Sequence, residues 1–169
     1  MLGLRWLVSL LLLQIFCFRT AITLFGSEAN LMSKSKIEKI IGSGSYGVVY
    51  KGRHVDLGCV AIKVQKIDTV EELRLANVEV DILQSLSHEN ILHYYDHQTI
   101  PIDLKRSHFY ICTELMDFDL SALIRSRRIE QSVLRSLSKQ LLYAVQYIHR
   151  QNILHLDIKP GNILVSREG

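Results

Sequence analysis

A glycine-rich run, Ile41-Gly42-Ser43-Gly44-Ser45-Tyr46-Gly47-Val48-Val49, most constrains the fold of this 169-residue chain. A dinucleotide-binding loop with the same G-x-G-x-x-G spacing opens a helix and precedes an acidic ribose ligand by about 20 residues. Here the loop runs into β-branched residues, and the residue 21 positions after Gly42 is Lys63. A Walker A loop would end in Gly-Lys-Ser/Thr, which is absent. Two interpretations remain: a strand–loop–strand flap whose backbone N–H groups cover nucleotide phosphates, and an ordinary hairpin with glycines at positive φ.

The apolar pattern around this loop predicts five strands with one inserted helix, followed by a mainly helical part. Strands are expected where β-branched and aromatic residues are enriched, over 37–41, 48–50, 59–64, 91–95 and 109–115, with a short one over 163–165. Apolar residues at three- and four-residue steps predict helices over 69–86 and 132–150. The expected apolar faces are Leu73, Ala76, Val80, Leu83 and Leu86 in the first helix, after Thr69 as N-cap, and Leu134, Leu137, Leu141, Val145 and Ile148 in the second. Residues 30–36 are predicted to form a polar linker.

A predicted strand and a predicted helix each carry one charge that needs a partner. Lys63 ends the run Val60-Ala61-Ile62-Lys63, where a lysine alone would be an outward-facing charge. Glu79 shares the helix face of Ala76 and Val80, where a carboxylate should not remain unpaired. An inward Lys63 and an inward Glu79 would form an ion pair, and phosphate oxygens at Lys63 would offset the cost of burying it.

A compact polar loop, His155-Leu156-Asp157-Ile158-Lys159-Pro160-Gly161-Asn162, follows the second helix. Its Asp can orient a hydroxyl and accept the proton, its Lys can neutralise a transferring phosphoryl group, and its amide oxygen can hold Mg²⁺. The alternative is a plain polar turn after a helix. The order and spacing of four motifs, namely the glycine loop, the Val-Ala-Ile-Lys run, Glu79 and this polar loop, argue against that alternative.

Together these motifs make residues 37–169 resemble the first half of a eukaryotic serine/threonine protein kinase domain. The resemblance implies an α+β, protein-kinase-like fold, with a five-stranded antiparallel N-lobe and helix C over 37–115, a hinge over 114–120 and the start of a helical C-lobe over 121–169. It implies ATP-dependent transfer of the γ-phosphoryl group to protein hydroxyls, with ATP and Mg²⁺ as cofactors. The short hinge and the Ser-Tyr-Gly-Val-Val-Tyr run are similar to the cyclin-dependent and MAP kinase group, which would imply a regulatory protein subunit as partner.

The resemblance also assigns roles to single residues of this sequence. Lys63 would hold the α- and β-phosphates and Glu79 would position it. Asp157 would be the catalytic base, Lys159 would neutralise the phosphoryl group, and Asn162 would bind Mg²⁺. The ATP-binding set would comprise Gly42, Ser43, Gly44, Ser45, Tyr46 and Gly47 over the phosphates, Ile41, Val49, Ala61 and Leu164 around adenine, Thr113 as gatekeeper, Glu114 and Met116 at the adenine edge, and Asp119 near the ribose.

The sequence departs from the family pattern in two places. Leu156 stands where the family usually has an arginine that pairs with a phosphorylated activation loop, which predicts control independent of that phosphorylation. A similar H-L-D run occurs in kinases of the Mos and Wee types. No Asp-Phe-Gly or Ala-Pro-Glu follows Val165, so we expect a partial domain that is inactive on its own. A non-catalytic, kinase-like module that binds nucleotide or a partner is the alternative.

The N-terminal region, residues 1–36, contains an apolar stretch over 6–25 that reaches membrane-spanning length only if Arg19 is tolerated. A signal peptide, an anchor and extra sequence without a targeting role all remain open. The net charge of +3 argues against a nucleic-acid partner. The three cysteines lack metal-ligand spacing and an even number, which favours free thiols in a reducing, cytoplasmic compartment.

Overall fold

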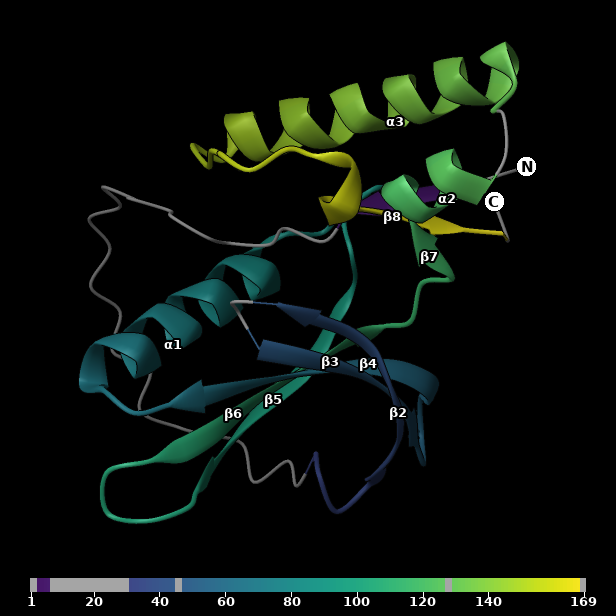
Figure 1. Cartoon of the computed structure of the whole chain (residues 1–169). Helices are drawn as coiled ribbons and strands as arrows, with labels where there is room; N and C mark the ends of the chain where they lie inside the picture. The colour runs from purple at the N-terminus through teal and green to yellow at the C-terminus, as the bar shows by residue number, and fades with distance from the viewer. Residues whose placement is uncertain (1–2, 7–30, 45–46, 127–128, 168–169) are drawn as a thin grey trace. The chain divides into compact units, whose positions relative to one another are not determined.

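The computed structural model describes residues 3–6, 31–44, 47–126 and 129–167. Their contacts divide them into two units (Figure 1). The strand-rich unit contains residues 31–82 and 94–115, and the helical unit contains residues 3–6, 83–93 and 116–167. The sequence places the whole of 37–115 in one lobe, whereas the contacts group 83–93 with the helical unit.

An antiparallel five-stranded sheet with one inserted helix forms the strand-rich unit, as the sequence predicts (Figure 1). The strand order is β2-β3-β4-β6-β5. The elements are β2 (Ser35–Gly44), β3 (Gly47–His54), β4 (Gly58–Ile67), α1 (Val70–Ser85), β5 (Tyr94–Pro101) and β6 (Ser107–Glu114). Because successive side chains of a strand point to opposite faces, the apolar and functional residues of β4 separate cleanly. Val60 and Ile62 lie on one face, and Ala61 and Lys63 lie on the other.

The face that carries Val60 and Ile62 is closed by a residue from the predicted linker. Leu31 is only 1% exposed and packs in one cluster with Val60, Ile62 and Cys112. The backbone N–H of Met32 donates to Gln98 Oε1 at 2.9 Å and so ties this segment to β5. The prediction of a polar linker over 30–36 is therefore wrong for its described residues, because a single leucine there fills the sheet's outer core and β2 already begins at Ser35.

The strand predicted over 91–95 begins later than expected. Ile91 and Leu92 are buried but precede β5, which starts at Tyr94 and continues to Pro101. A short apolar run indicates burial rather than a particular secondary structure, so the prediction located the buried residues and misplaced the strand. The polar residues that follow join the sheet because they complete the hydrogen-bonded ladder with β6.

Helix α1 begins with reciprocal capping at its N-terminus. Thr69 Oγ1 accepts the backbone N–H of Glu72 at 3.1 Å, and Glu72 Oε2 accepts the backbone N–H of Thr69 at 3.0 Å. These bonds satisfy N–H groups that have no partner within the helix. Ala76 and Val80 are buried on the predicted apolar face, and α1 lies along the sheet face that carries Lys63 (Figure 1).

The helical unit combines two helices with a three-stranded sheet. Its elements are β1 (Gly3–Trp6), β7 (Phe118–Asp119), α2 (Leu120–Ser126), α3 (Gln131–Arg150), a 3₁₀ turn (Pro160–Asn162) and β8 (Ile163–Ser166). The strand order is β1-β8-β7, so the first described residues pair with the last strand. The sequence predicts neither β1 nor β7, because pairing between segments this distant leaves no local pattern.

Helix α3 matches its predicted range, but its apolar face is rotated from the predicted stripe. Leu137, Ala144 and Ile148 are buried, whereas Leu134 is 44% exposed. A loop from residues 87–90 docks on this helix, since Ser87 N–H donates to the Tyr147 hydroxyl at 3.0 Å. No helix in the described ranges is long and apolar enough to cross a membrane. Most of the apolar stretch over 6–25 lies outside those ranges.

Candidate functional site

A buried ion pair joins β4 to α1 in the strand-rich unit. Lys63 Nζ donates to Glu79 Oε1 at 2.6 Å and to Oε2 at 2.9 Å, which is the pairing predicted from the sequence. The side chains are 17% and 9% exposed. Gln65 Nε2 also donates to Glu79 Oε2 at 3.0 Å. Gln65 is not among the residues predicted from the sequence, although its position two residues after Lys63 puts it on the same strand face.

Strand register brings other candidate residues onto the Lys63 face. Val49 pairs directly with Lys63, and Ala61 pairs with Thr113, so all four side chains share one surface of β3, β4 and β6. Thr113 is buried and its hydroxyl donates to the Glu114 carbonyl at 3.3 Å. The small residues Ala61 and Thr113 therefore lie side by side across the strands, next to the lysine.

The glycine loop connects β2 and β3, and its three glycines have different surroundings. Gly47 has a φ of +113°, and a Cβ there would clash with the Val64 backbone oxygen, so the hairpin itself requires glycine. At Gly44 a Cβ would meet no atom within 4 Å, and at Gly42 the nearest atom, on Val49, is 3.8 Å away. Neither has a positive φ, so nothing within the described chain explains these two glycines. A ligand approaching the backbone would explain them.

Ile41 and Ser43 lie on either side of Gly42 in this loop. Ser43 pairs with Val48 across the hairpin, while Ser45 and Tyr46 lie outside the described residues. Ile41 lies at a register shift between Ile40 and Gly42 and is 45% exposed. The apolar Ile41 side chain is therefore available for contact with a ligand.

The polar loop of the helical unit draws three candidate residues together. Lys159 Nζ lies 2.8 Å from Asp157 Oδ2, and Asn162 Nδ2 donates to the same oxygen at 2.8 Å and to the Asp157 carbonyl at 2.8 Å. The buried His155 holds the loop from the other side, since its carbonyl oxygen and Nδ1 accept the Asp157 N–H at 2.8 and 3.2 Å. Asp157, Lys159 and Asn162 thus form one cluster on a braced backbone.

Charge at this cluster keeps the aspartate ionised. The hydrogen bond from Lys159, reinforced by that from Asn162, holds the pKa of the Asp157 carboxyl below its ordinary value of 3.8. The carboxylate therefore carries its negative charge throughout the physiological pH range. It can accept a hydrogen bond from a hydroxyl group and orient it.

Leu156 has an unusual backbone conformation beside this cluster. Its φ is +58°, a left-handed value that is uncommon for residues other than glycine, and its side chain is 64% exposed. This conformation turns the chain between the buried His155 and Asp157. The hydrogen bonds between His155 and Asp157 and between Asn162 and Asp157 hold the backbone in this strained conformation.

The remaining candidates of the helical unit lie around β7 and β8. Asp119 and Leu164 are register partners in these strands, and Met116 lies just before β7. Asp119 Oδ1 accepts the Ala122 N–H at 2.7 Å and therefore caps α2. The sequence assigns Asp119 to a ribose and misses this capping role, although an aspartate immediately before a helix is a recognised sign of an N-cap.

Magnesium fits this chain only as an ion that arrives with phosphate groups. No cluster of three or more His, Cys, Asp or Glu side chains able to hold a metal occurs in the described part of the chain. Asn162 Nδ2 donates both of its hydrogen bonds to Asp157. The amide oxygen of Asn162 points away from these bonds and is the atom that could bind a cation. Mg²⁺ commonly takes one or two protein oxygens and completes its shell with phosphate and water oxygens, which agrees with this limited donor set.

Comparison with known proteins identifies the family. The family model of the protein kinase domain matches residues 35–169. The probable serine/threonine-protein kinase fhkB of Dictyostelium discoideum is 33% identical over 132 residues, which cover 75% of this chain. The chain spans 11% of the length of that relative. The five-stranded antiparallel sheet with α1 agrees with the N-lobe expected from the sequence. This chain belongs to the protein kinase domain family.

Proposed function

We propose that this chain binds Mg·ATP and carries the catalytic loop of a serine/threonine protein kinase, which transfers the γ-phosphoryl group to protein hydroxyls. The buried Lys63–Glu79 ion pair is the observation that carries the proposal. A buried pair is a poor source of stability compared with apolar residues of the same size, so its presence favours a functional reason. The match of the family model and the name of the curated relative support the same reaction class.

Lys63 is the proposed phosphate ligand. Its ammonium group has three N–H donors, of which Glu79 accepts two. The third donor is available for a phosphate oxygen. Glu79 is a positioning residue, because it holds Lys63 on the sheet face that also carries Val49 and Ala61, where the adenine would lie.

Asp157 is the proposed base and orienting group for the substrate hydroxyl. Lys159 shares its carboxylate at 2.8 Å and would turn to the phosphoryl group as negative charge develops there. Asn162 would hold Mg²⁺ through its amide oxygen. When bound, Mg²⁺ supplies neutralisation of the phosphate charge.

A second candidate function is a kinase-like module that binds nucleotide or a partner without transfer. The exposed Leu156 at φ +58° favours it, because an arginine at this position in the family links the catalytic loop to a phosphorylated segment. Both candidate functions include nucleotide binding, and they differ in whether the phosphoryl group is transferred.

One set of measurements tests both candidates. Mg·ATP binding to the full chain is measured by calorimetry for the parent, for Lys63→Met and for Lys66→Met, an exposed lysine of the same strand. We expect Lys63→Met alone to weaken binding, and equal affinities in all three would refute the nucleotide site. Transfer of radiolabelled phosphate to serine-, threonine- and tyrosine-containing peptides is then compared for the parent and Asp157→Asn, each extended by the Asp-Phe-Gly to Ala-Pro-Glu segment of a kinase domain, because the given residues alone are expected to be inactive. Transfer to serine or threonine that Asp157→Asn abolishes supports the kinase, whereas binding without transfer supports the module.

A further inference from the structure

A cavity of about 390 Å³ lies at the end of the β2–β3 hairpin in the strand-rich unit. Its described lining contains no acidic residue. Basic and hydrogen-bond-donating side chains dominate it, including Lys34, Ser35, Lys36, Arg53 and His54. This lining is suited to an anion, because each of these side chains can present a donor or a positive charge.

Two of the four cations of the hairpin, Lys36 and Arg53, line the cavity and are direct register partners across β2 and β3. Like charges directly opposite each other destabilise a strand pair. The Arg53 side chain is 65% exposed, and its one ion pair within the described ranges is a long contact with Glu38, at 3.4 Å. Lys36 has no ion-pair partner among the residues that the structure describes. A bound anion would relieve the repulsion between Lys36 and Arg53.

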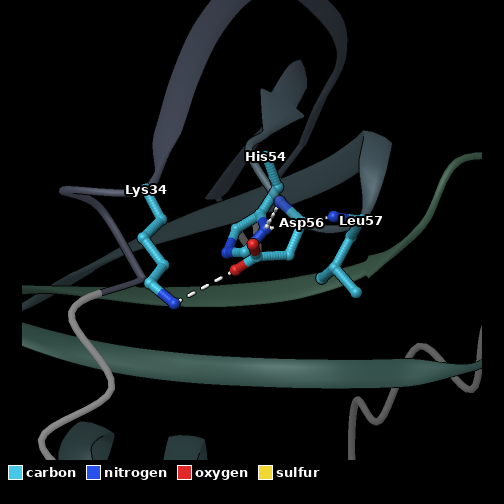
Figure 2. A network of polar contacts seen from close by, with 4 residues as sticks. All are labelled: Lys34, His54, Asp56 and Leu57. Atoms are coloured by element: carbon cyan, nitrogen blue, oxygen red, sulfur yellow. Dashed lines mark hydrogen bonds and ion pairs between the residues drawn. The ribbon is translucent and has the colours of Figure 1, made fainter.

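His54 makes the wall of this cavity rigid. Its buried ring accepts, at Nδ1, the backbone N–H groups of Asp56 at 3.1 Å and Leu57 at 3.3 Å. Figure 2 shows the ring between the Lys34 side chain and the turn that carries Asp56 and Leu57. Because Nδ1 accepts both bonds, the neutral ring carries its proton on Nε2 and remains a donor there.

The segment before β2 is fixed to the same turn. Lys34 forms an ion pair with Asp56 at 3.1 Å, which Figure 2 also shows, and the Lys34 carbonyl oxygen accepts the Val55 N–H at 2.9 Å. Ser35 lines the cavity, and its hydroxyl has no hydrogen-bond partner in the described part of the chain. His54 and the Lys34–Ser35 segment are therefore held by the fold before any ligand arrives, which lowers the cost of ordering this part of the lining.

We infer that this cavity binds a phosphate monoester, either free or carried on a phosphorylated protein. A phosphate monoester brings close to two negative charges and three acceptor oxygens, which match the several donors of this lining better than a single carboxylate does. The cavity lining shares no residue with the proposed nucleotide site. By strand alternation, His54 lies on the sheet face of Ile62, whereas Arg53 and its register partner Lys36 lie on the face of Lys63. The cavity therefore lies at the end of the sheet, where residues of both faces line it.

The alternative explanation is that the lysines only protect an edge strand. β2 is at the edge of the sheet, and lysines at such edges discourage pairing with other chains. That explanation predicts no saturable binding of phosphate. Arg53 belongs to β3, which is an inner strand, so edge protection does not account for it.

The test titrates the full chain with inorganic phosphate and with a phosphoserine peptide, by calorimetry at low salt. The double variant Lys36→Gln/Arg53→Gln removes the two hairpin cations that line the cavity. The double variant Lys66→Gln/Lys105→Gln removes two exposed cations elsewhere in the same unit and serves as the matched control. Lys63→Met reports any phosphate that binds at the nucleotide site instead.

We expect the hairpin variant to weaken phosphate binding roughly tenfold or more, because charge-assisted hydrogen bonds are lost. The control should retain the parent affinity, and Lys63→Met should retain the binding that the hairpin variant loses. Tighter binding of the peptide than of inorganic phosphate would identify a phosphorylated protein as the ligand, and equal affinities would show that the cavity recognises the phosphate group alone. Binding by the hairpin variant equal to that of the parent, or loss in Lys63→Met alone, would overturn the inference.

A second measurement uses the unmodified chain and does not depend on any variant folding. Hydrogen exchange is followed with and without phosphate. We expect slower exchange over 33–36 and 53–58, which contain the cavity-lining residues. Unchanged exchange in both segments at saturating phosphate would contradict the proposed site.

Discussion

Removing one partner of the Lys63–Glu79 pair should destabilise the strand-rich unit far more than removing both. The variant Lys63→Met removes the cation and leaves the Glu79 carboxylate with the hydrogen bond from Gln65. Loss of one member of a buried pair costs about 3–5 kcal/mol when the remaining charge is fully buried. Lys63 and Glu79 are still 17% and 9% exposed, so some hydration persists. We therefore expect a loss of about 2–3 kcal/mol.

The double variant Lys63→Met/Glu79→Leu should recover most of that loss. Both charges are gone, and the new side chains are apolar and of similar length, so no uncompensated charge remains. We expect its stability to lie within about 1 kcal/mol of the parent. Nucleotide binding should still be lost, because the proposed phosphate donor is absent. This variant therefore distinguishes the effect of the ion pair on stability from its effect on nucleotide binding.

Urea unfolding followed by far-UV circular dichroism measures these effects. Lys66→Met, an exposed lysine on the same strand, is the control and should change stability by no more than about 0.5 kcal/mol. The interaction energy comes from the cycle of parent, Lys63→Met, Glu79→Leu and the double variant. The reasoning fails if Lys63→Met is no less stable than Lys66→Met, or if the two single losses simply add in the double variant.

Three further predictions concern single residues. Gly47→Ala should lose about 2 kcal/mol or more in urea unfolding, because φ is +113° and a Cβ meets backbone, whereas Gly44→Ala should be nearly neutral for stability and should weaken nucleotide binding. Burial raises the pKa of the Cys112 thiol to about 12, so mass spectrometry after brief iodoacetamide treatment at neutral pH should find the exposed Cys59 alkylated first; equal rates would be inconsistent with this. The lowered pKa of Asp157 means that its charge stabilises the fold above the ordinary value of 3.8 and that this contribution is lost as the pH falls through the folded-state pKa. The difference in unfolding midpoint between Asp157→Asn and the parent should therefore shrink at acid pH, and a constant difference would count against this assignment.

Local sequence determined most of the secondary structure and the chemistry of the candidate residues. The capped helix after Thr69 follows from a hydroxyl, a carboxylate three residues later and a repeating apolar face, all of which act within one turn or along one helix. The pairing of Lys63 with Glu79 was predictable for a similar reason, because each charge lies in an otherwise apolar pattern and needs a partner.

Tertiary structure alone decided which distant segments meet. Leu31 joins the core beneath β4 and residues 3–6 pair with β8, although no sequence pattern in either segment indicates which segment it contacts. The physical reason is that burial and strand pairing stabilise contacts between surfaces, however far apart the segments lie in the sequence. Periodicity along the chain shows that a residue must be covered, and only the folded chain shows what covers it.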